Sequence, residues 1–384
     1  MEHSHLDILL YGHDGRGLGH VSRAAAIGMA LKRLFPHLKV CLLTGCRQTQ
    51  ELLGEVPLDW IKLPAYDTEV IAGQSTGIDG PSGLDDKELG WLRAEQIKQV
   101  IHLYRPRLVL ADHTPQGKHR ELVAALEADL ENRPIWVLGM RGVVGTVAQT
   151  SSETALELYR RHYSGLLWYG DSTVLGGEHL GLLRNRFAAE PVECGYVSRL
   201  VEQITFAPPQ AVRRHGCTIS IPWFSEHTAL FFDKLVEALG LLGPEYGRVR
   251  IFLGTNDIQT LKQKLDGLDF CTVERFSDQY VQSLCSSRCA LIFGGYNSVV
   301  DVLSAAVPAL VVMRDMKDGE QQVHLQALAA APGIRLAAVV EAECTVEQLY
   351  QELGGLLRSD LDPLQLSVNL GGAEKAARTL VEML

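Results

Sequence analysis

Short apolar runs alternate with stretches of helical length along the whole chain, and this alternation starts afresh in the second half. Residues 7–11 have the length of one buried strand, and residues 22–34 have the length and periodicity of a helix. Parallel strands need long connections, so strands that alternate with helices predict a parallel sheet covered by crossover helices. The pattern therefore predicts an α/β protein made of two doubly wound, Rossmann-like domains.

The proline-bearing segment Phe206-Ala207-Pro208-Pro209-Gln210 separates the two halves and is the best candidate for a linker. With 384 residues, the chain is longer than one that usually folds around a single hydrophobic core. We predict an N-terminal domain at 1–205, a linker at 206–214 and a C-terminal domain at 215–384. Open α/β sheets bind ligands beyond the carboxyl ends of their strands, so the two domains are expected to face each other across a ligand-binding cleft.

The predicted strands fall into two series. The first comprises residues 7–11, 39–44, 59–63, 108–111, 135–138, 165–169 and 192–194. The second comprises residues 217–221, 249–253, 271–274, 290–293, 309–313 and 337–340. Predicted helices between them include residues 86–104, 117–131, 225–241, 298–306 and 320–331. Residues 65–84 form a loop longer than an ordinary connection, which is typical of a functional or mobile segment.

Composition excludes some classes of function. The formal net charge of −10 argues against a nucleic-acid-binding protein, which would carry a basic surface. The same charge removes long-range attraction to anionic membranes, although a local basic patch stays open. The eight cysteines are scattered without a CxxC pair, which favours buried free thiols in a reducing compartment. The N-terminus lacks a basic, cleavable leader, so a cytoplasmic location is expected.

The most informative motif is the turn Phe293-Gly294-Gly295-Tyr296-Asn297-Ser298, which joins a predicted strand to a predicted helix. Two glycines allow a ligand to approach the backbone, and a helix start offers free N–H groups to a phosphate. Asp301 follows in that helix, where a carboxylate can accept hydrogen bonds from sugar hydroxyls. Together these residues predict a nucleotide-sugar site, with a plain solvated helix face as the alternative.

A second polar cluster belongs to the same predicted site. Arg314 ends the strand at 309–313, and Glu320-Gln321 opens the next helix. We expect Arg314 either to contact a phosphate or to hold the loop that precedes Glu320.

The first strand runs into Gly12-His13-Asp14-Gly15-Arg16-Gly17-Leu18-Gly19-His20. The spacing of these glycines is not that of a dinucleotide-binding fingerprint, and no acid ends the second strand, so NAD is not expected. His20 is predicted near a helix start. A histidine there can act as a general base because its pKa lies near neutrality, or it can simply cap the turn.

Two further strands end in polar residues. Asp112 follows the strand at 108–111 and is expected to orient His20, to deprotonate an acceptor itself, or to serve only as an N-cap. Arg141 lies just beyond the strand at 135–138, where it can bind a phosphate or an acceptor carboxylate bidentately, or form a surface ion pair.

These motifs resemble the glycosyltransferase family 28 pattern, and more closely a bacterial group of predicted glycosyltransferases of the same superfamily. The resemblance spans roughly residues 6–330. It is carried by Gly17-Leu18-Gly19-His20-Val21-Ser22-Arg23-Ala24, Asp112-His113-Thr114-Pro115-Gln116-Gly117, Leu138-Gly139-Met140-Arg141, Tyr169-Gly170-Asp171, Gly195-Tyr196-Val197, Gly294-Gly295-Tyr296-Asn297, and Arg314 with Glu320-Gln321.

The resemblance implies a GT-B fold, with an N-terminal acceptor domain and a C-terminal domain that binds a UDP- or TDP-type sugar donor. It implies that Gly294, Gly295, Tyr296, Asn297 and Ser298 line the diphosphate. Asp301 would bind the ribose, Glu320 and Gln321 the donor sugar, and His20 or Asp112 would act on the acceptor. No bound cofactor or metal is implied, because the nucleotide sugar is a co-substrate.

The chain departs from the family pattern near the donor site. Relatives carry a glycine-rich loop after the first strand of the C-terminal domain, whereas this chain has Ile221-Pro222-Trp223-Phe224-Ser225. Ser225 and backbone amides must then replace that loop if a phosphate binds there. His324 stands where relatives often carry arginine.

The expected activity is an inverting, metal-independent sugar transfer to the hydroxyl or amine of a small-molecule acceptor, with a secondary-metabolite pathway as one setting. Helix N-termini and amide donors can stabilise the charge on the leaving diphosphate. A nucleotide-sugar hydrolase or epimerase on the same fold and a non-catalytic nucleotide-sugar binder stay open as alternatives. A homodimer also stays open.

Overall fold

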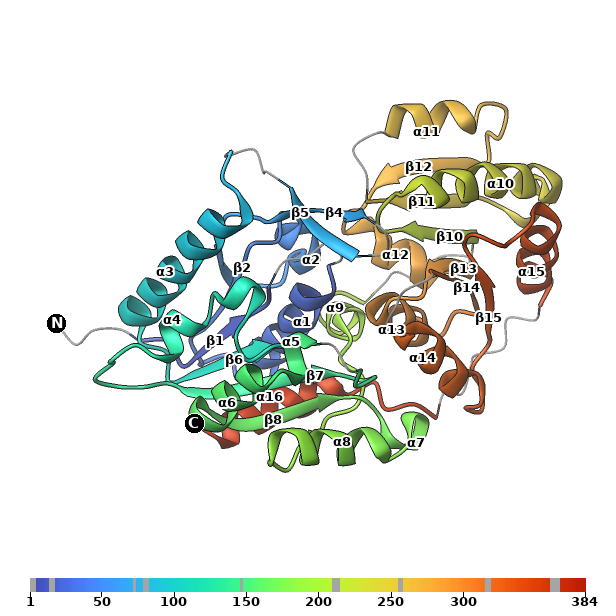
Figure 1. The fold of residues 1–384 in the computed structure, drawn as a ribbon. Coiled ribbons are helices and arrows are strands. Elements are labelled where there is room, and N and C mark those ends of the chain that lie inside the picture. The colour runs from blue at the N-terminus through green and yellow to red at the C-terminus, as the bar shows by residue number, and fades with distance from the viewer. Residues whose placement is uncertain are drawn as a thin grey trace. The chain divides into compact units, whose positions relative to one another are not determined.

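The computed structural model describes residues 5–13, 18–71, 74–78, 83–145, 148–208, 215–254, 258–314, 319–359 and 367–384, with side chains outside 67–78 and 148–149. The chain divides into two compact units (Figure 1). Unit 1 comprises Met1–Phe206 and Val368–Leu384, and unit 2 comprises Ala207–Ser367. The division falls at the start of the predicted linker at 206–214, of which residues 209–214 lie outside the described part.

Unit 1 is built on a seven-stranded sheet with the order β3-β2-β1-β6-β7-β8-β9, and all its strand pairs are parallel. The strands are β1 (Ile8–Tyr11), β2 (Val40–Thr44), β3 (Asp59–Lys62), β6 (Leu108–Asp112), β7 (Ile135–Arg141), β8 (Tyr163–Tyr169) and β9 (Val192–Glu193). The central strands are buried on both faces, as their unbroken apolar runs require. The strand order reverses between β1 and β6, so this pair is a topological switch point.

The helices of unit 1 connect these strands. They are α1 (Gly19–Leu34), α2 (Thr49–Leu53), α3 (Asp86–Tyr104), α4 (Val123–Leu126), α5 (Ala148–Ser151), α6 (Glu153–His162), α7 (Ser172–Leu175), α8 (Glu178–Phe187) and α9 (Arg199–Phe206). Asp85 starts α3 with a capping box in which its side chain accepts from two backbone N–H groups while Glu88 reaches back.

Unit 2 repeats the architecture with the strand order β12-β11-β10-β13-β14-β15, again all parallel. Its strands are β10 (His215–Ile221), β11 (Val249–Leu253), β12 (Cys271–Arg275), β13 (Ser287–Phe293), β14 (Ala309–Met313) and β15 (Leu336–Val340). The order reverses between β10 and β13, which is the switch point of this unit. The predicted pair of doubly wound α/β domains is therefore confirmed.

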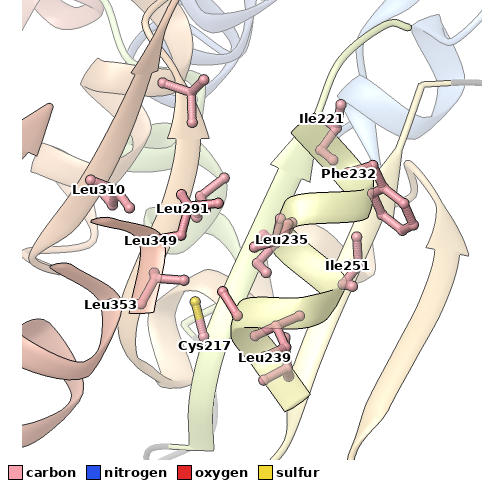
Figure 2. Close-up of a cluster of buried hydrophobic side chains, with 14 of the residues drawn as sticks. Cys217, Ile221, Phe232, Leu235, Leu239, Ile251, Leu291, Leu310, Leu349 and Leu353 are labelled. Atoms are coloured by element: carbon pink, nitrogen blue, oxygen red, sulfur yellow. The ribbon is translucent and has the colours of Figure 1, made fainter. Parts of the chain in front are cut away.

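The core of unit 2 packs helices α10 (Glu226–Leu242) and α15 (Val346–Arg358) against the sheet. Figure 2 shows Leu235 and Leu239 of α10 beside the strands, and Leu349 and Leu353 of α15 near the β13 and β14 side chains. Each fully buried leucine contributes about 1.5–3 kcal/mol through the hydrophobic effect. The other helices are α11 (Ile258–Lys264), α12 (Gln279–Ser286), α13 (Tyr296–Ser304) and α14 (Glu320–Ala329).

The last helix, α16 (Gly372–Glu382), departs from the domain limits expected from the sequence, since it packs against α1 of unit 1 (Figure 1). The returning segment approaches the 195–196 backbone very closely. Tyr196 donates its N–H to the Asn369 carbonyl at 2.8 Å, and Gly372 donates to the Tyr196 carbonyl at 3.1 Å. A Cβ on Gly372 would lie 2.5 Å from the carbonyl oxygen of Gly195, so only glycine fits.

Local structure also differs from the sequence-based expectations. The helix predicted at 117–131 is only a 3-10 turn (Lys118–Arg120) followed by the four residues of α4. His119 and Arg120 have φ angles of 49° and 64°, which are incompatible with a continuous right-handed helix. The long loop at 65–84 contains an antiparallel hairpin of β4 (Asp67–Ile71) and β5 (Gln74–Ile78).

All eight cysteines are free thiols, and six of them are buried. Within the described residues, the structure contains no helix with the length and apolarity needed to span a membrane.

Candidate active site

The carboxyl ends of β1 and β6 meet at the switch point of unit 1, and two of the predicted site residues meet there. Gly19 and His20 begin α1, which follows β1, and Asp112 ends β6. Nδ1 of His20 lies 2.5 Å from Oδ2 of Asp112. The parallel pairing of β1 with β6 thus brings together residues that are 92 positions apart in the chain.

Arg23 completes the cluster from the next turn of α1. Its Nε donates to Oδ1 of Asp112 at 3.1 Å, and its Nη2 donates to Oδ2 at 2.7 Å. The side chains of Arg23 and Asp112 are only 2% and 3% exposed, whereas that of His20 is 19% exposed. Positions three apart on a helix share a face, which lets His20 and Arg23 reach one carboxylate.

The contacts determine which nitrogen of His20 carries the proton in its neutral form. Both Asp112 and Arg23 approach Nδ1, the latter with Nη2 at 3.0 Å. Arg23 can only donate and already has two acceptor oxygens, so we assign the proton of His20 to Nδ1, facing the carboxylate. Nε2 is then left with a lone pair, which is the arrangement of a general base held in one tautomer.

Electrostatics keep this histidine neutral. Burial, and next the charge of His13, whose tilted ring lies 3.6 Å away between centroids, lower the pKa of His20 against the opposing effect of Asp112. Burial alone would raise the pKa of Asp112, but Arg23 and then His20 outweigh it, so the pKa of this carboxyl lies below its usual range. Around neutral pH, Asp112 is ionised and His20 is an unprotonated base.

The loop after Asp112 is held rigidly. Thr114 donates its N–H to the Asp112 carbonyl at 3.0 Å, and Tyr163 donates its hydroxyl to the Pro115 carbonyl at 2.7 Å. At the far end of the loop, the completely buried pair of Arg93 and Glu121 is joined at 2.6 and 2.9 Å. This framework fixes the segment that carries Asp112 and His113.

In unit 2, the glycine turn brings Gly294 and Gln321 together. Gly294 follows β13, and Gln321 lies in the first turn of α14. A Cβ on Gly294 would lie 2.9 Å from Oε1 of Gln321, so the side-chain amide of Gln321 can lie this close only because residue 294 has no side chain. The same oxygen accepts the backbone N–H of Arg314 at 3.2 Å. The amide nitrogen of Gln321 is thereby oriented as a donor.

Gly295 is the N-cap residue of α13, and no side chain caps this helix start. Tyr296, Asn297 and Ser298 form the first turn and are half-buried. The ring of Tyr296 stacks on that of His324 at 5.9 Å between centroids with an interplanar angle of 16°. Asp301 lies further along α13 and is 8% exposed. A helix start without a side-chain cap leaves its first N–H groups available to an anion, and diphosphate binding there stays a prediction.

Arg314 has a different environment from the one expected for a phosphate ligand. Its Nε donates to Glu341 at 3.2 Å, and its Nη2 donates to the Trp223 carbonyl at 2.8 Å and to Thr228 at 3.2 Å. The guanidinium also lies over the rings of Trp223 and Phe293, at 3.4 and 4.1 Å from their centroids. These contacts commit the guanidinium to protein groups, and a phosphate contact stays a prediction.

Ser225 is committed as well. It is the N-cap of α10, where its Oγ accepts the N–H of Thr228 at 3.3 Å. Thr228 in turn donates its hydroxyl to Glu341 at 2.6 Å. The turn between β10 and α10, where the family pattern has glycines, is thus closed by Trp223, Ser225, Thr228 and the Arg314–Glu341 pair.

The predicted site residues fall into one group in each unit. Unit 1 holds Gly19, His20, Asp112 and Arg141 at the carboxyl ends of β1, β6 and β7. Unit 2 holds the others at the ends of β10, β13 and β14 and at the starts of the following helices: Ser225, Gly294, Gly295, Tyr296, Asn297, Ser298, Asp301, Arg314, Glu320 and Gln321. The segment Gly15-Arg16-Gly17 lies outside the described residues.

Sequence reasoning missed the roles of Arg23 and Glu341. The role of Arg23 could have been predicted from the sequence, since this residue lies three positions after His20 in the same motif. No sequence pattern pointed to Glu341, because it follows β15 and meets Arg314 only through the fold. Among the residues that the structure describes, no three His, Cys, Asp or Glu side chains form a group suited to a metal ion.

Comparison with known proteins identifies the fold. Neither a protein-family model nor a curated protein sequence matches the chain. Solved structures do match over nearly its whole length. MurG of Acinetobacter baumannii has a TM-score of 0.52 at 15% identity, covering 98% of this chain and 99% of its own.

Two other structures broaden the comparison. The UDP-GlcNAc 2-epimerase of Neisseria meningitidis bound to UDP-GlcNAc has a TM-score of 0.60 at 14% identity, with 98% of each chain covered. The glycotransferase of kitacinnamycin has a TM-score of 0.54 at 12% identity, again with 98% of each chain covered. At these identities the likeness concerns the fold: this chain has the GT-B fold that such transferases and epimerases share.

Proposed function

We propose that this protein is a nucleotide-sugar-dependent glycosyltransferase that inverts the anomeric centre and requires no metal. The observation that carries the proposal is the His20–Asp112 pair, in which a partly exposed neutral imidazole is held in one tautomer by a buried carboxylate. Nε2 of His20 would take the proton from an acceptor hydroxyl or amine as that group attacks the anomeric carbon. Asp112 would stabilise the imidazolium that forms, and the nucleoside diphosphate would leave.

The donor is assigned to unit 2. The uncapped start of α13 offers backbone N–H groups and a positive dipole end to the diphosphate, which also stabilises the charge that develops on departure. Asp301 would accept the ribose hydroxyls, and Gln321 with Glu320 would bind the donor sugar. UDP- and TDP-sugars are the first donors to test. The acceptor is proposed to be a small molecule, with secondary metabolism as the setting.

An epimerase that acts on a UDP-sugar is the second candidate. It is favoured by the higher TM-score with the Neisseria epimerase, 0.60, than with MurG, 0.52. Epimerisation requires groups that remove and return a proton on the sugar itself. Three acids in the described part of unit 1 are bound by other protein groups: Asp112 by Arg23, Glu121 by Arg93, and Asp171 by the Asn369 N–H at 2.7 Å. This occupation supports the transferase over the epimerase.

A thermal-shift panel of uridine, thymidine, guanosine and adenosine diphosphates tests the donor site. Ligands that bind the native state raise the melting temperature by mass action. We expect UDP or TDP to raise it, and Asp301→Ala to abolish that shift. The Asp278→Ala variant, at the start of α12, is the matched control and should keep it. No shift with any nucleotide at millimolar concentration would overturn the donor assignment.

Product analysis then separates the activities. The responsive nucleotide is supplied as its sugar conjugates, with and without a set of acceptors. A transferase yields a new glycoside and free nucleoside diphosphate only when an acceptor is present. Release of an epimer or of free sugar without an acceptor would contradict the transferase and establish the second candidate or a hydrolase.

A further inference from the structure

The backbone at the end of β6 is strained beside the proposed base. His113 has a φ of 73°, in the left-handed region that a residue other than glycine adopts at a cost. Its N–H donates to the Gly139 carbonyl of β7 at 2.7 Å, which holds the residue in place. Its ring lies 5.4 Å from the ring of His20. The strain therefore presents a second imidazole next to His20.

Two polar atoms of this loop lack a hydrogen-bond partner in the structure. They are Nδ1 of His113 and Oγ1 of Thr114, both buried from solvent. Thr114 as a whole is 5% exposed. Burying such atoms without a partner costs free energy, so native proteins usually satisfy them. A polar ligand bound beside His20 would supply the missing partners.

The neighbouring loop at 142–145 adds positive charge. Arg141 ends β7, and its charge is, after burial, the main cause that lowers the pKa of His113. Arg186 of α8 donates from Nη1 to the Gly145 carbonyl at 3.1 Å. Among the described residues, no carboxylate forms an ion pair with the half-buried Arg186. Its pKa is lowered by burial alone.

The titratable groups near this loop include the exposed Glu178, whose charge opposes the lowering of the pKa of His179 by burial. Asp112 is paired with Arg23, and His179 accepts the Val144 N–H at 3.3 Å. The chain carries a formal net charge of −10, yet Arg186 has no ion pair with a carboxylate of the described residues. Guanidinium groups bind carboxylates and phosphates in a fork geometry that a neutral sugar does not offer.

We propose that His113, Thr114, Arg141 and Arg186 form an anion subsite that binds a carboxylate or phosphate of the acceptor. The inference rests on the proposed function, because it places this anionic group beside the hydroxyl or amine that His20 deprotonates. The separation of the His20 and His113 rings corresponds to a few covalent bonds. The acceptor is therefore a small acid, such as a sugar acid or a sugar phosphate, rather than a neutral molecule.

The test compares glucuronate, glucose 6-phosphate and glucose as probes on the full-length chain at matched ionic strength. Binding is followed by thermal shift and by the NMR signals of the histidine rings. The variants are Arg141→Gln and His113→Asn, since asparagine tolerates positive φ and removes only the imidazole. Arg184→Gln is the control, because Arg184 lies on the same helix as Arg186 but is exposed and paired with Glu190 at 2.5 Å.

We expect glucuronate or glucose 6-phosphate, and not glucose, to raise the melting temperature and to shift the signals of His20 and His113. The preferred anion identifies the acceptor group as carboxylate or phosphate. Arg141→Gln and His113→Asn should weaken that binding roughly tenfold or more, as expected for a lost charge-assisted hydrogen bond, while Arg184→Gln leaves it unchanged. Equal responses to glucose and the anions, no response to either anion, or an equal loss in Arg184→Gln would overturn the subsite.

This outcome is separate from that of the transferase proposal. Anion binding without any nucleotide binding in unit 2 would keep the subsite and reject the transferase. Transfer that proceeds equally well to neutral acceptors would keep the transferase and reject the subsite.

Discussion

Oδ2 of Asp112 lies 2.5 Å from Nδ1 of His20, while Nη2 and Nε of Arg23 donate to the same carboxylate at 2.7 and 3.1 Å. One acid thus neutralises a buried arginine and orients a histidine. Asp112 serves stability through Arg23 and the proposed chemistry through His20, and substitutions can separate these two roles.

Replacing His20 with glutamine should remove the base and leave the fold intact. A glutamine amide can still donate to Asp112, so the Arg23–Asp112 pair survives. General base catalysis contributes about 10²–10⁴-fold, and we expect kcat to fall by that factor. The donor nucleotide should bind as before, because its site belongs to unit 2. Steady-state kinetics and nucleotide titration measure both effects, and an unchanged kcat would exclude His20 as the base.

Asp112→Asn should instead destabilise the protein. It leaves the guanidinium of Arg23 buried without an anion, and breaking a buried pair in this way costs about 3–5 kcal/mol. Urea unfolding measures the loss. Glu153→Gln is the control, because its partner Arg160 and Glu153 itself are 48% and 79% exposed, and exposed pairs contribute about 0–1 kcal/mol. Equal stability of the two variants would contradict the structural role of Asp112.

Activity should persist to lower pH than an ordinary histidine allows. The base is active when neutral, and burial together with His13 lowers the pKa of His20. The acid limb of kcat/KM is therefore expected below about pH 6.5, the ordinary value for histidine. His13→Phe should move that limb upward, because it removes the second imidazole while keeping an aromatic ring. A limb that stays in place would show that His13 has no such effect.

Stability should fall as the pH drops below about 6.5. The pKa values of His20 and His113 are lowered in the folded state, so in this range the unfolded chain binds more protons than the native one. Below the ordinary pKa, each such group lowers the free energy of unfolding by about 1.36 kcal/mol per pH unit, until the pH reaches the pKa of that group in the folded state. Asp112, with a depressed pKa, loses its contribution only under much more acidic conditions. Urea midpoints at pH 7.5, 6.5 and 5.5 for the wild type and His113→Asn, which removes one of the two groups, check the slope.

Removing Glu341 should destabilise unit 2. The side chains of Arg314 and Glu341 are 6% and 7% exposed, so Glu341→Gln leaves a buried guanidinium without its anion. The expected cost is about 3–5 kcal/mol. The fluorescence of Trp223, whose ring lies 3.4 Å from that guanidinium, should report the loss. Glu274→Gln removes the more exposed partner of Arg250 and should cost far less. Similar losses in both variants would reject a structural role for the Arg314–Glu341 pair.

Gly294→Ala should weaken donor binding with little effect on stability. The added Cβ would lie 2.9 Å from Oε1 of Gln321, which is the far end of a flexible side chain and can move away. Losing one oriented hydrogen bond of about 1 kcal/mol corresponds to roughly fivefold in affinity. Gly355→Ala in α15, where a Cβ meets nothing within 4 Å, is the control. Titration with the responsive nucleotide sugar measures the change, and wild-type affinity would show that Gln321 does not bind the donor.

The sequence by itself determined the repeated β/α architecture. Buried parallel strands must be continuous apolar runs, so strands such as β11 and β14 coincide with the runs at 249–253 and 309–313. It also placed polar candidates at strand ends, because the carboxyl ends of a parallel sheet meet at one edge. His20 and Asp112 were therefore predictable as neighbours from the pattern of the chain.

The tertiary structure alone decided how those residues are used. The position of Arg314 in the sequence is compatible with a phosphate ligand. In the structure its guanidinium donates hydrogen bonds to Glu341 and to the Trp223 carbonyl, and neither partner is near Arg314 in the chain. The last helix belongs to unit 1 because Gly372 fits against the 195–196 backbone, a contact between distant segments. Local periodicity encodes which face of an element is apolar, whereas pairing of buried charges and docking of a terminal helix depend on long-range packing that no local pattern records.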